Sequence, residues 1–179
     1  MVIINLLYFF EVVMGGILLS SAFSHSKNTH KFKNSIKSYN IVKKNSTIRF
    51  LSIIIILMEF LFGLFMVLNI FKLATLFGTL CLLSIFTIAI LYNLINGNKN
   101  ISCGCGGIVG DSSLSWKLVA RNIFIILILI IDIIYSYIYI DVKPLFNHTV
   151  RSVIYGFALL TLLVINTNNY LNKIKNSIS

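Results

Sequence analysis

The stretch from Phe50 to Ile95, FLSIIIILMEFLFGLFMVLNIFKLATLFGTLCLLSIFTIAILYNLI, contains two apolar runs, 50–70 and 73–95, separated by Phe71 and Lys72. A helix needs roughly 20 apolar residues to cross a ~30 Å hydrocarbon layer, and each run has that length. Neither run alternates apolar with polar residues, and a helix satisfies its backbone groups internally. The stretch therefore predicts an antiparallel hairpin of two transmembrane helices.

Three further apolar runs lie at 3–23, 122–140 and 150–165. Hydrophobic residues make up 58% of the chain, more than one soluble core of this length can hide. We expect an all-α integral membrane protein that forms one membrane domain over 1–179, a bundle of four to five transmembrane helices. The run at 150–165 is the shortest, so it is either a full span or a peripheral helix.

The basic residues, which give a net charge of +10, lie outside the apolar runs. This distribution indicates membrane topology and argues against a nucleic-acid partner. Seven basic residues fall in the first connection, and only Lys72, Lys143 and Arg151 fall on the opposite side. The positive-inside rule then places the amino terminus outside and the first loop, the loop at 96–117 and the tail in the cytoplasm of a multi-pass protein. The abundance of Ile, Asn and Lys hints at a bacterial cell membrane.

The basic connection at 24–49 carries an apolar stripe, formed by Phe32, Ile36, Tyr39 and Val42 at helical spacing. This pattern predicts an interfacial amphipathic segment on anionic lipid headgroups. A solvated basic hairpin is the alternative.

The segment NKNISCGCGGIVGDSS (98–113) places Cys103 and Cys105 one glycine apart in a loop. A disulfide between them would close a very small, strained and readily reduced ring. Such a short loop also yields little stabilisation, so redox chemistry fits the pair better than support. Two alternatives stay open, a metal half-site completed by His25 and His30, or thiols without a role. We expect Cys81 to be a small buried apolar side chain.

Three of the five acids, Glu11, Glu59 and Asp132, fall near the centres of apolar runs. Ionisable residues inside a membrane are candidates for function. No Lys, Arg or His lies within the centres of these runs, so we expect the three carboxyl groups to be protonated or paired, or to hydrogen-bond helix to helix. Glu59 is a candidate catalytic residue that either handles protons or lines a pocket for a quinone, the one cofactor that the sequence brings into consideration.

The chain resembles the redox-associated MauE and DoxX-like membrane proteins, whose members carry a Cys-x-Cys-aromatic-Gly loop and an Arg-Asn pair opening the next helix. The resemblance rests on CGCGG, LSWKLVARNIFIIL, SSAFSHSKNTHKFKNSIKSYNIV and MEFLFG. The matching positions are Cys103, Cys105, Gly107, Arg121, Asn122, Glu59 and Gly63. Gly106 replaces the aromatic residue of the family pattern.

The resemblance implies a membrane component that works with thioredoxin-like proteins in thiol-disulfide exchange during maturation of exported proteins. We therefore expect a thiol-disulfide oxidoreductase in which Cys103 and Cys105 carry the exchange, with Lys99 and Lys117 favouring the thiolate. Disulfide formation in exported proteins occurs outside the cytoplasm, whereas the charge count places the cysteine loop inside. Either the protein takes reducing equivalents from cytoplasmic thiols, or its orientation in the membrane is inverted. The rivals are a non-enzymatic accessory or immunity protein and, third, a transporter. Trp116 and Tyr92 are expected to anchor the membrane interface.

Overall fold

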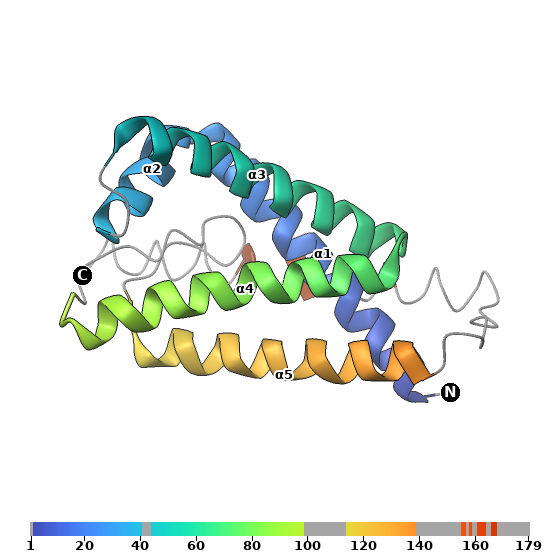
Figure 1. Cartoon of the computed structure of the whole chain (residues 1–179). Coiled ribbons are helices and arrows are strands. Elements are labelled where there is room, and N and C mark those ends of the chain that lie inside the picture. The colour runs from blue at the N-terminus through green and yellow to red at the C-terminus, as the bar shows by residue number, and fades with distance from the viewer. Residues whose placement is uncertain are drawn as a thin grey trace.

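The computed structural model describes residues 2–40, 44–98, 114–138 and, near the carboxyl terminus, 155–156, 158, 161–163 and 166–167. The described elements are all helices (Figure 1). They are α1 (Val2–Lys27), α2 (Thr29–Ser38), α3 (Asn45–Leu68), α4 (Lys72–Ile95) and α5 (Trp116–Ile138).

Four of these helices are long and apolar enough to cross a membrane: Asn5–Lys27 within α1, and α3, α4 and α5 over their full lengths. The sequence-based prediction of an all-α membrane bundle is therefore confirmed. The helices extend beyond the predicted spans, since α1 continues to Lys27, α3 begins at Asn45 and α5 begins at Trp116. Polar residues at these ends prolong the helices without adding apolar length, so hydropathy alone missed them.

The four long helices form two antiparallel pairs, α1 with α3 and α4 with α5, and α3 also packs against α4 (Figure 1). All four contribute to one buried apolar cluster. Its fully buried members are Met14, Leu18, Met66, Leu76, Leu82 and Leu129. This shared core fixes the two pairs relative to each other and leaves polar side chains buried on either side of it.

The α1 and α3 backbones approach closely at Gly15 and Gly63. A Cβ on Gly15 would lie 2.8 Å from the Gly63 carbonyl oxygen, and a Cβ on Gly63 would lie 2.9 Å from that of Gly15. Small residues at such crossings are common between membrane helices, because they allow the backbones to pack directly. Gly63, which matched the family pattern, therefore has a packing role.

A tight turn joins α3 to α4. Asn69 and Phe71 both adopt left-handed backbone conformations, with φ of 53° and 48°. The amide of Ile70 donates to the carbonyl of Phe65 and closes the end of α3. This turn confirms the predicted hairpin and sets Lys72 as the first residue of α4.

The outer faces of α3, α4 and α5 are covered with exposed apolar side chains, as expected of helices in lipid. Cys81 belongs to this outer surface, because its side chain is exposed. The prediction that Cys81 is buried was wrong. A thiol is small and apolar enough to face either lipid or core, so residue type alone does not determine its side.

The predicted fifth span, 150–165, lies largely outside the described residues. Those that are described are helical at 155–156, 158 and 161–163. The Tyr8 hydroxyl donates to the Tyr155 hydroxyl at 2.8 Å, and Tyr155 donates to the carbonyl of Val67 at 2.8 Å. Ala158 joins a buried cluster with Tyr8 and Val12 on α1. This part of the segment therefore packs against the α1 and α3 pair.

Candidate functional site

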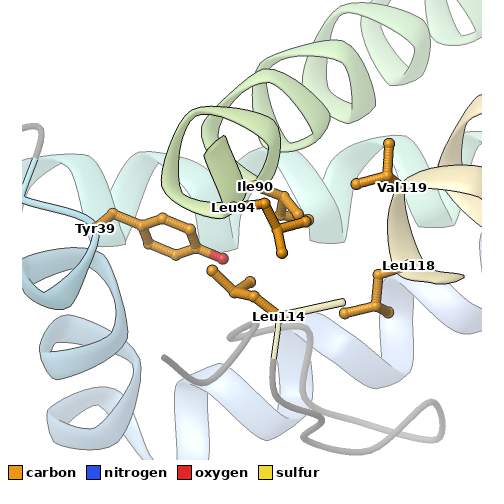
Figure 2. Packing of buried hydrophobic residues seen from close by; sticks show 6 residues of the cluster. All are labelled: Tyr39, Ile90, Leu94, Leu114, Leu118 and Val119. Atoms are coloured by element: carbon orange, nitrogen blue, oxygen red, sulfur yellow. The ribbon is translucent and has the colours of Figure 1, made fainter. Parts of the chain in front are cut away.

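Cys103 and Cys105 lie outside the described residues, but both ends of their loop are described. The loop leaves α4 after Ile95 and returns to α5 through the buried residue Leu114. Leu114 belongs to an apolar cluster that closes the base of the loop (Figure 2). The members are Tyr39, Ile90, Leu94, Leu114, Leu118 and Val119. Residues from α4, from α5 and from the end of α2 thus hold the two ends of the loop together.

Asn93 adds polar contacts to this base. Its side chain is fully buried, and its Nδ2 donates to the carbonyl of Ala89 at 3.0 Å and to that of Tyr39 at 3.3 Å. Its Oδ1 accepts from Nδ2 of Asn98 at 3.4 Å, at the start of the loop. Burial also raises the pKa of Tyr39 to about 12. Asn93 therefore links the loop to the segment that follows α2.

The amino terminus of α5 lies directly after the loop. The Ser115 carbonyl accepts from the amide of Leu118, as expected at the start of a helix. Lys117 in this first turn is exposed, and so is Trp116. Positive charge from the helix end and from Lys117 is therefore available near the return of the loop.

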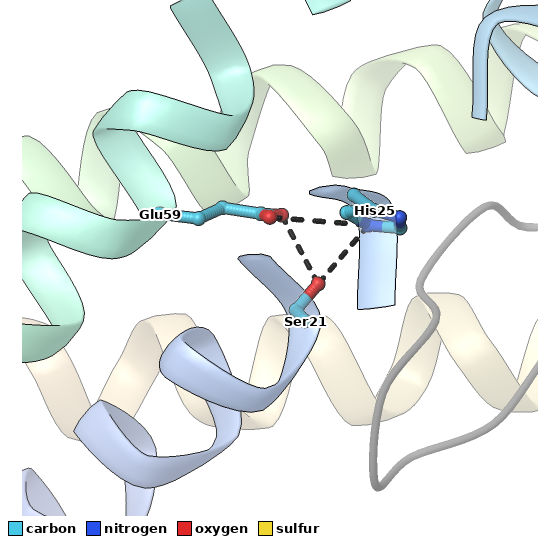
Figure 3. Close-up of polar contacts among 3 residues, drawn as sticks. All are labelled: Ser21, His25 and Glu59. Atoms are coloured by element: carbon cyan, nitrogen blue, oxygen red, sulfur yellow. Dashed lines mark hydrogen bonds and ion pairs between the residues drawn. The ribbon is translucent and has the colours of Figure 1, made fainter. Parts of the chain in front are cut away.

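The α2 end of the bundle contains the first buried polar cluster, formed by Ser21, His25 and Glu59 (Figure 3). Ser21 Oγ donates to Glu59 Oε1 at 3.3 Å and lies 3.1 Å from His25 Nε2. His25 Nε2 lies 3.8 Å from Glu59 Oε2. Glu59, a predicted site residue, thus contacts two α1 side chains rather than lipid.

The hydrogen-bond directions in this cluster follow from its donors. Ser21 donates to Glu59 Oε1, and its oxygen can also accept from His25 Nε2 when this nitrogen carries the proton. The result is a chain of donors that runs from His25 through Ser21 to Glu59. Such a chain can pass a proton toward the carboxyl group.

Helix α2 covers this cluster. The Phe32 ring stacks on the His25 ring with centroids 3.9 Å apart, and Phe32 and Tyr39 are both buried. The predicted helix in the basic segment is present, but these two residues of its apolar stripe face the bundle rather than lipid headgroups. Helical spacing identifies an apolar face and does not specify what covers it.

The two histidines of the alternative metal half-site, His25 and His30, have different surroundings. His25 is buried and bonded to Ser21, whereas His30 is exposed and its Nδ1 lies 3.4 Å from Asn34 Nδ2. Within the described ranges, no group of three His, Cys, Asp or Glu residues could hold a metal ion. His25 instead belongs to the acid–base cluster, the name used from here on for Ser21, His25 and Glu59.

A second buried polar cluster lies at the α3–α4 turn. Lys72 Nζ lies 2.6 Å from Glu11 Oε1 and 3.4 Å from Asp132 Oδ1. Asp132 Oδ1 also accepts from Ser136 Oγ at 3.3 Å. Glu11 and Asp132 are thus paired, although no basic residue lies within the centres of the apolar runs, because the long Lys72 side chain turns inward from the first residue of α4.

Sequence reasoning found the three acids but missed their partners. Lys72 was assigned to topology, and His25 was considered only as a metal ligand. One available signal was the isolation of Lys72, the single charged residue in a short turn between two apolar runs. Ser21 and Asn93 had no such signal, since serine and asparagine are common at helix ends.

The family model described as "Methylamine utilisation protein MauE" matches residues 3–135. The match covers the four long helices and the Cys-x-Cys loop. No curated protein and no solved structure matches the chain.

Proposed function

Because the chain belongs to the methylamine utilisation protein MauE family, we propose that it is a membrane thiol-disulfide exchange component. Cys103 and Cys105 carry the exchange, and a thioredoxin-like protein is the partner. The observation that carries the proposal is the CGCGG sequence in a loop whose two ends meet on one buried base.

The buried base supports the proposal because it fixes where the glycine-rich loop begins and ends. Leu114 and Asn98 hold its ends against α2, α4 and α5. A partner protein needs a reactive sulfur at a defined and accessible place, and loops on a rigid scaffold provide this. The base therefore fixes both ends of the segment that carries the two sulfurs.

The exchange itself is balanced between the chain and its partner. A partner thiolate attacks one sulfur of the Cys103–Cys105 disulfide, and the other sulfur leaves as a thiolate that takes up a proton. The second partner thiol loses its proton and attacks the mixed disulfide, which releases an oxidised partner and the reduced pair. The reverse sequence transfers the electrons back. Lys117 and the amino terminus of α5 favour the thiolate form.

Glu59 is proposed as the proton-handling residue on the same side of the bundle. It is buried, and Ser21 and His25 connect it toward α2. The base of the loop includes Tyr39, which follows α2, so the acid–base cluster and the loop share one covering helix. The alternative role of Glu59, lining a quinone pocket, stays a prediction.

Capture of a thioredoxin tests the proposal. Two variants of the full chain are used, Cys81→Ser with Cys103→Ser and Cys81→Ser with Cys105→Ser, so that each keeps one loop cysteine. The probe is a thioredoxin with a single cysteine, and this cysteine is joined to an aromatic thiol by a disulfide bond. Attack by the remaining cysteine releases the aromatic thiol and leaves a mixed disulfide that no second cysteine resolves. We expect at least one single variant to form this adduct more than tenfold faster than the Cys103→Ser/Cys105→Ser chain, whose only cysteine is Cys81.

If both single variants react no faster than the chain whose only cysteine is Cys81, the redox proposal is wrong. The chain would then be a membrane accessory or immunity protein whose cysteines have another role. Helical content measured by circular dichroism controls for folding in each variant.

A further inference from the structure

The cluster at the α3–α4 turn has no part in the exchange proposed above. It joins three helices through Glu11 on α1, Lys72 on α4 and Asp132 on α5. Both carboxyl oxygens contact the same nitrogen, so they lie within about 6 Å of each other. The cluster lies at the opposite end of the bundle from the base of the Cys-x-Cys loop (Figure 1).

The charges of this cluster do not balance when all three groups are ionised. Two carboxylates and one ammonium have a net charge of −1. The side chains of Glu11 and Asp132 are at most 2% exposed, so this charge is buried. An uncompensated charge buried in this way is destabilised by several kcal/mol. One bound proton makes the cluster neutral while the ammonium keeps both contacts.

Asp132 provides an oxygen that can accept this proton. Its Oδ1 is engaged by Lys72 and Ser136, whereas its buried Oδ2 has no hydrogen-bond partner among the described residues. A buried carboxylate oxygen without a donor is unfavourable, and protonation removes its charge.

The surroundings offer no other charged group among the described residues of the packed helices. Tyr8 and Tyr135, each three residues from one of the acids, are the nearest titratable side chains by sequence, and α3 carries no charged residue after Glu59. Tyr8 donates to Tyr155. The charge on the cluster is therefore determined by its own three members.

We propose that Glu11, Lys72 and Asp132 form a proton-binding site that holds one exchangeable proton shared by the two carboxyl groups. The proton belongs to the pair rather than to one residue, because both acids contact the same ammonium. The Lys72 side chain is 32% exposed and connects the site to the surface at the turn. The protein thus has a second acid–base centre at the end of the bundle away from the cysteines.

The test is labelling of the full chain in membranes with dicyclohexylcarbodiimide, which reacts with protonated carboxyl groups in apolar surroundings, followed by peptide mapping. We expect about one label per chain distributed between Glu11 and Asp132, decreasing as the pH rises. Lys72→Gln should increase the total toward two labels, because neither acid then has a counter-ion.

The decisive variants are Glu11→Gln and Asp132→Asn, which nearly preserve shape. Each leaves one carboxyl group beside Lys72, a pair that is neutral without a bound proton, so labelling of the remaining acid should be lost. Glu59→Gln is the matched control and should leave labelling of the cluster unchanged.

Two results would overturn the proposal. One is a wild-type chain in which neither Glu11 nor Asp132 is labelled at any pH. The other is an Asp132→Asn chain whose Glu11 is labelled as in wild type, because the acids would then titrate independently. The infrared band of protonated carboxyl groups provides a second measurement: the Glu59→Gln chain should keep the component that belongs to the cluster, and each single variant of Glu11 or Asp132 that remains helical should lose it.

Discussion

The bundle has a buried polar cluster toward each end, and the acids of the two clusters have different partners. Glu59 contacts a serine and a histidine under the aromatic ring of Phe32. Glu11 and Asp132 contact the ammonium group of Lys72. One cluster is a hydrogen-bonded chain, whereas the other is an ion cluster that joins three helices.

Because of this difference, substitutions in the two clusters should affect the free energy of unfolding to different extents. Removing the ammonium group of a buried ion cluster leaves carboxylates without a counter-ion, which is strongly destabilising. Exchanging a carboxyl group for an amide in a neutral hydrogen-bonded chain has a small effect. The Lys72 cluster should therefore dominate stability, and the Glu59 cluster should affect proton movement more than folding.

The largest effect is expected for Lys72→Met. The variant leaves Glu11 and Asp132 without a counter-ion and should lower the free energy of unfolding by about 3–5 kcal/mol at neutral pH. Acid should reduce this loss, because protons then neutralise both carboxyl groups. Denaturant unfolding in detergent, followed by circular dichroism, measures the change.

Lys117→Met is the matched control for this variant. Lys117 is exposed in the first turn of α5, so its replacement should change the free energy of unfolding by no more than about 0.5 kcal/mol. Equal stability of the two variants would show that the Lys72 contacts do not hold the helices together.

An intermediate effect is expected at high pH from Tyr39, at the α2 end. Its pKa in the folded chain is about 12, above the ordinary tyrosine value of 10.0, because burial of the side chain disfavours the phenolate. Between these values the unfolded chain releases the proton and the folded chain keeps it, so stability falls as the pH rises. The loss attributable to Tyr39 should reach up to about 2 kcal/mol.

Comparison with Tyr39→Phe isolates this contribution, since the other tyrosines and the lysines titrate in both chains. The difference between the two stability curves should be constant below pH 10 and should change above it. A constant difference up to pH 12 would contradict the burial of Tyr39 in the base of the loop.

The smallest effect on stability is expected for Glu59→Gln. The amide oxygen can still accept from Ser21, so the free energy of unfolding should fall by no more than about 1 kcal/mol. Unfolding under the same conditions as for Lys72→Met provides the comparison. A loss as large as that of Lys72→Met would mean that Glu59 and His25 form a charged pair, and the contrast between the clusters would disappear.

Much of this architecture was predictable from apolar length alone. The antiparallel hairpin of α3 and α4 follows from two runs of spanning length separated by Phe71 and Lys72. Helix ends were less predictable, because polar residues such as Ser24 and Asn45 can continue a helix beyond the apolar run. The side of Cys81 was not predictable, since α4 is apolar on all faces.

The candidate site was predictable in part. The rarity of acids in apolar runs identified Glu11, Glu59 and Asp132 as unusual. Their partners depend on tertiary packing, which brings Lys72 from a turn and His25 from a helix end to distant acids. Cys103 and Cys105 were identified from spacing, and their reactivity stays a prediction.

The central claim is that Cys103 and Cys105 form a reversible dithiol–disulfide couple exposed to water, and side-specific maleimide labelling tests it most directly. The Cys81→Ser chain in sealed vesicles is first either oxidised with oxidised thioredoxin or reduced. A membrane-impermeant maleimide is then added to one face of the membrane or to the other, and the number of labels is read from the intact mass of the chain. The account predicts no labels after oxidation and two after reduction, on one face only. Two labels in both states, or none in either on both faces, would contradict it.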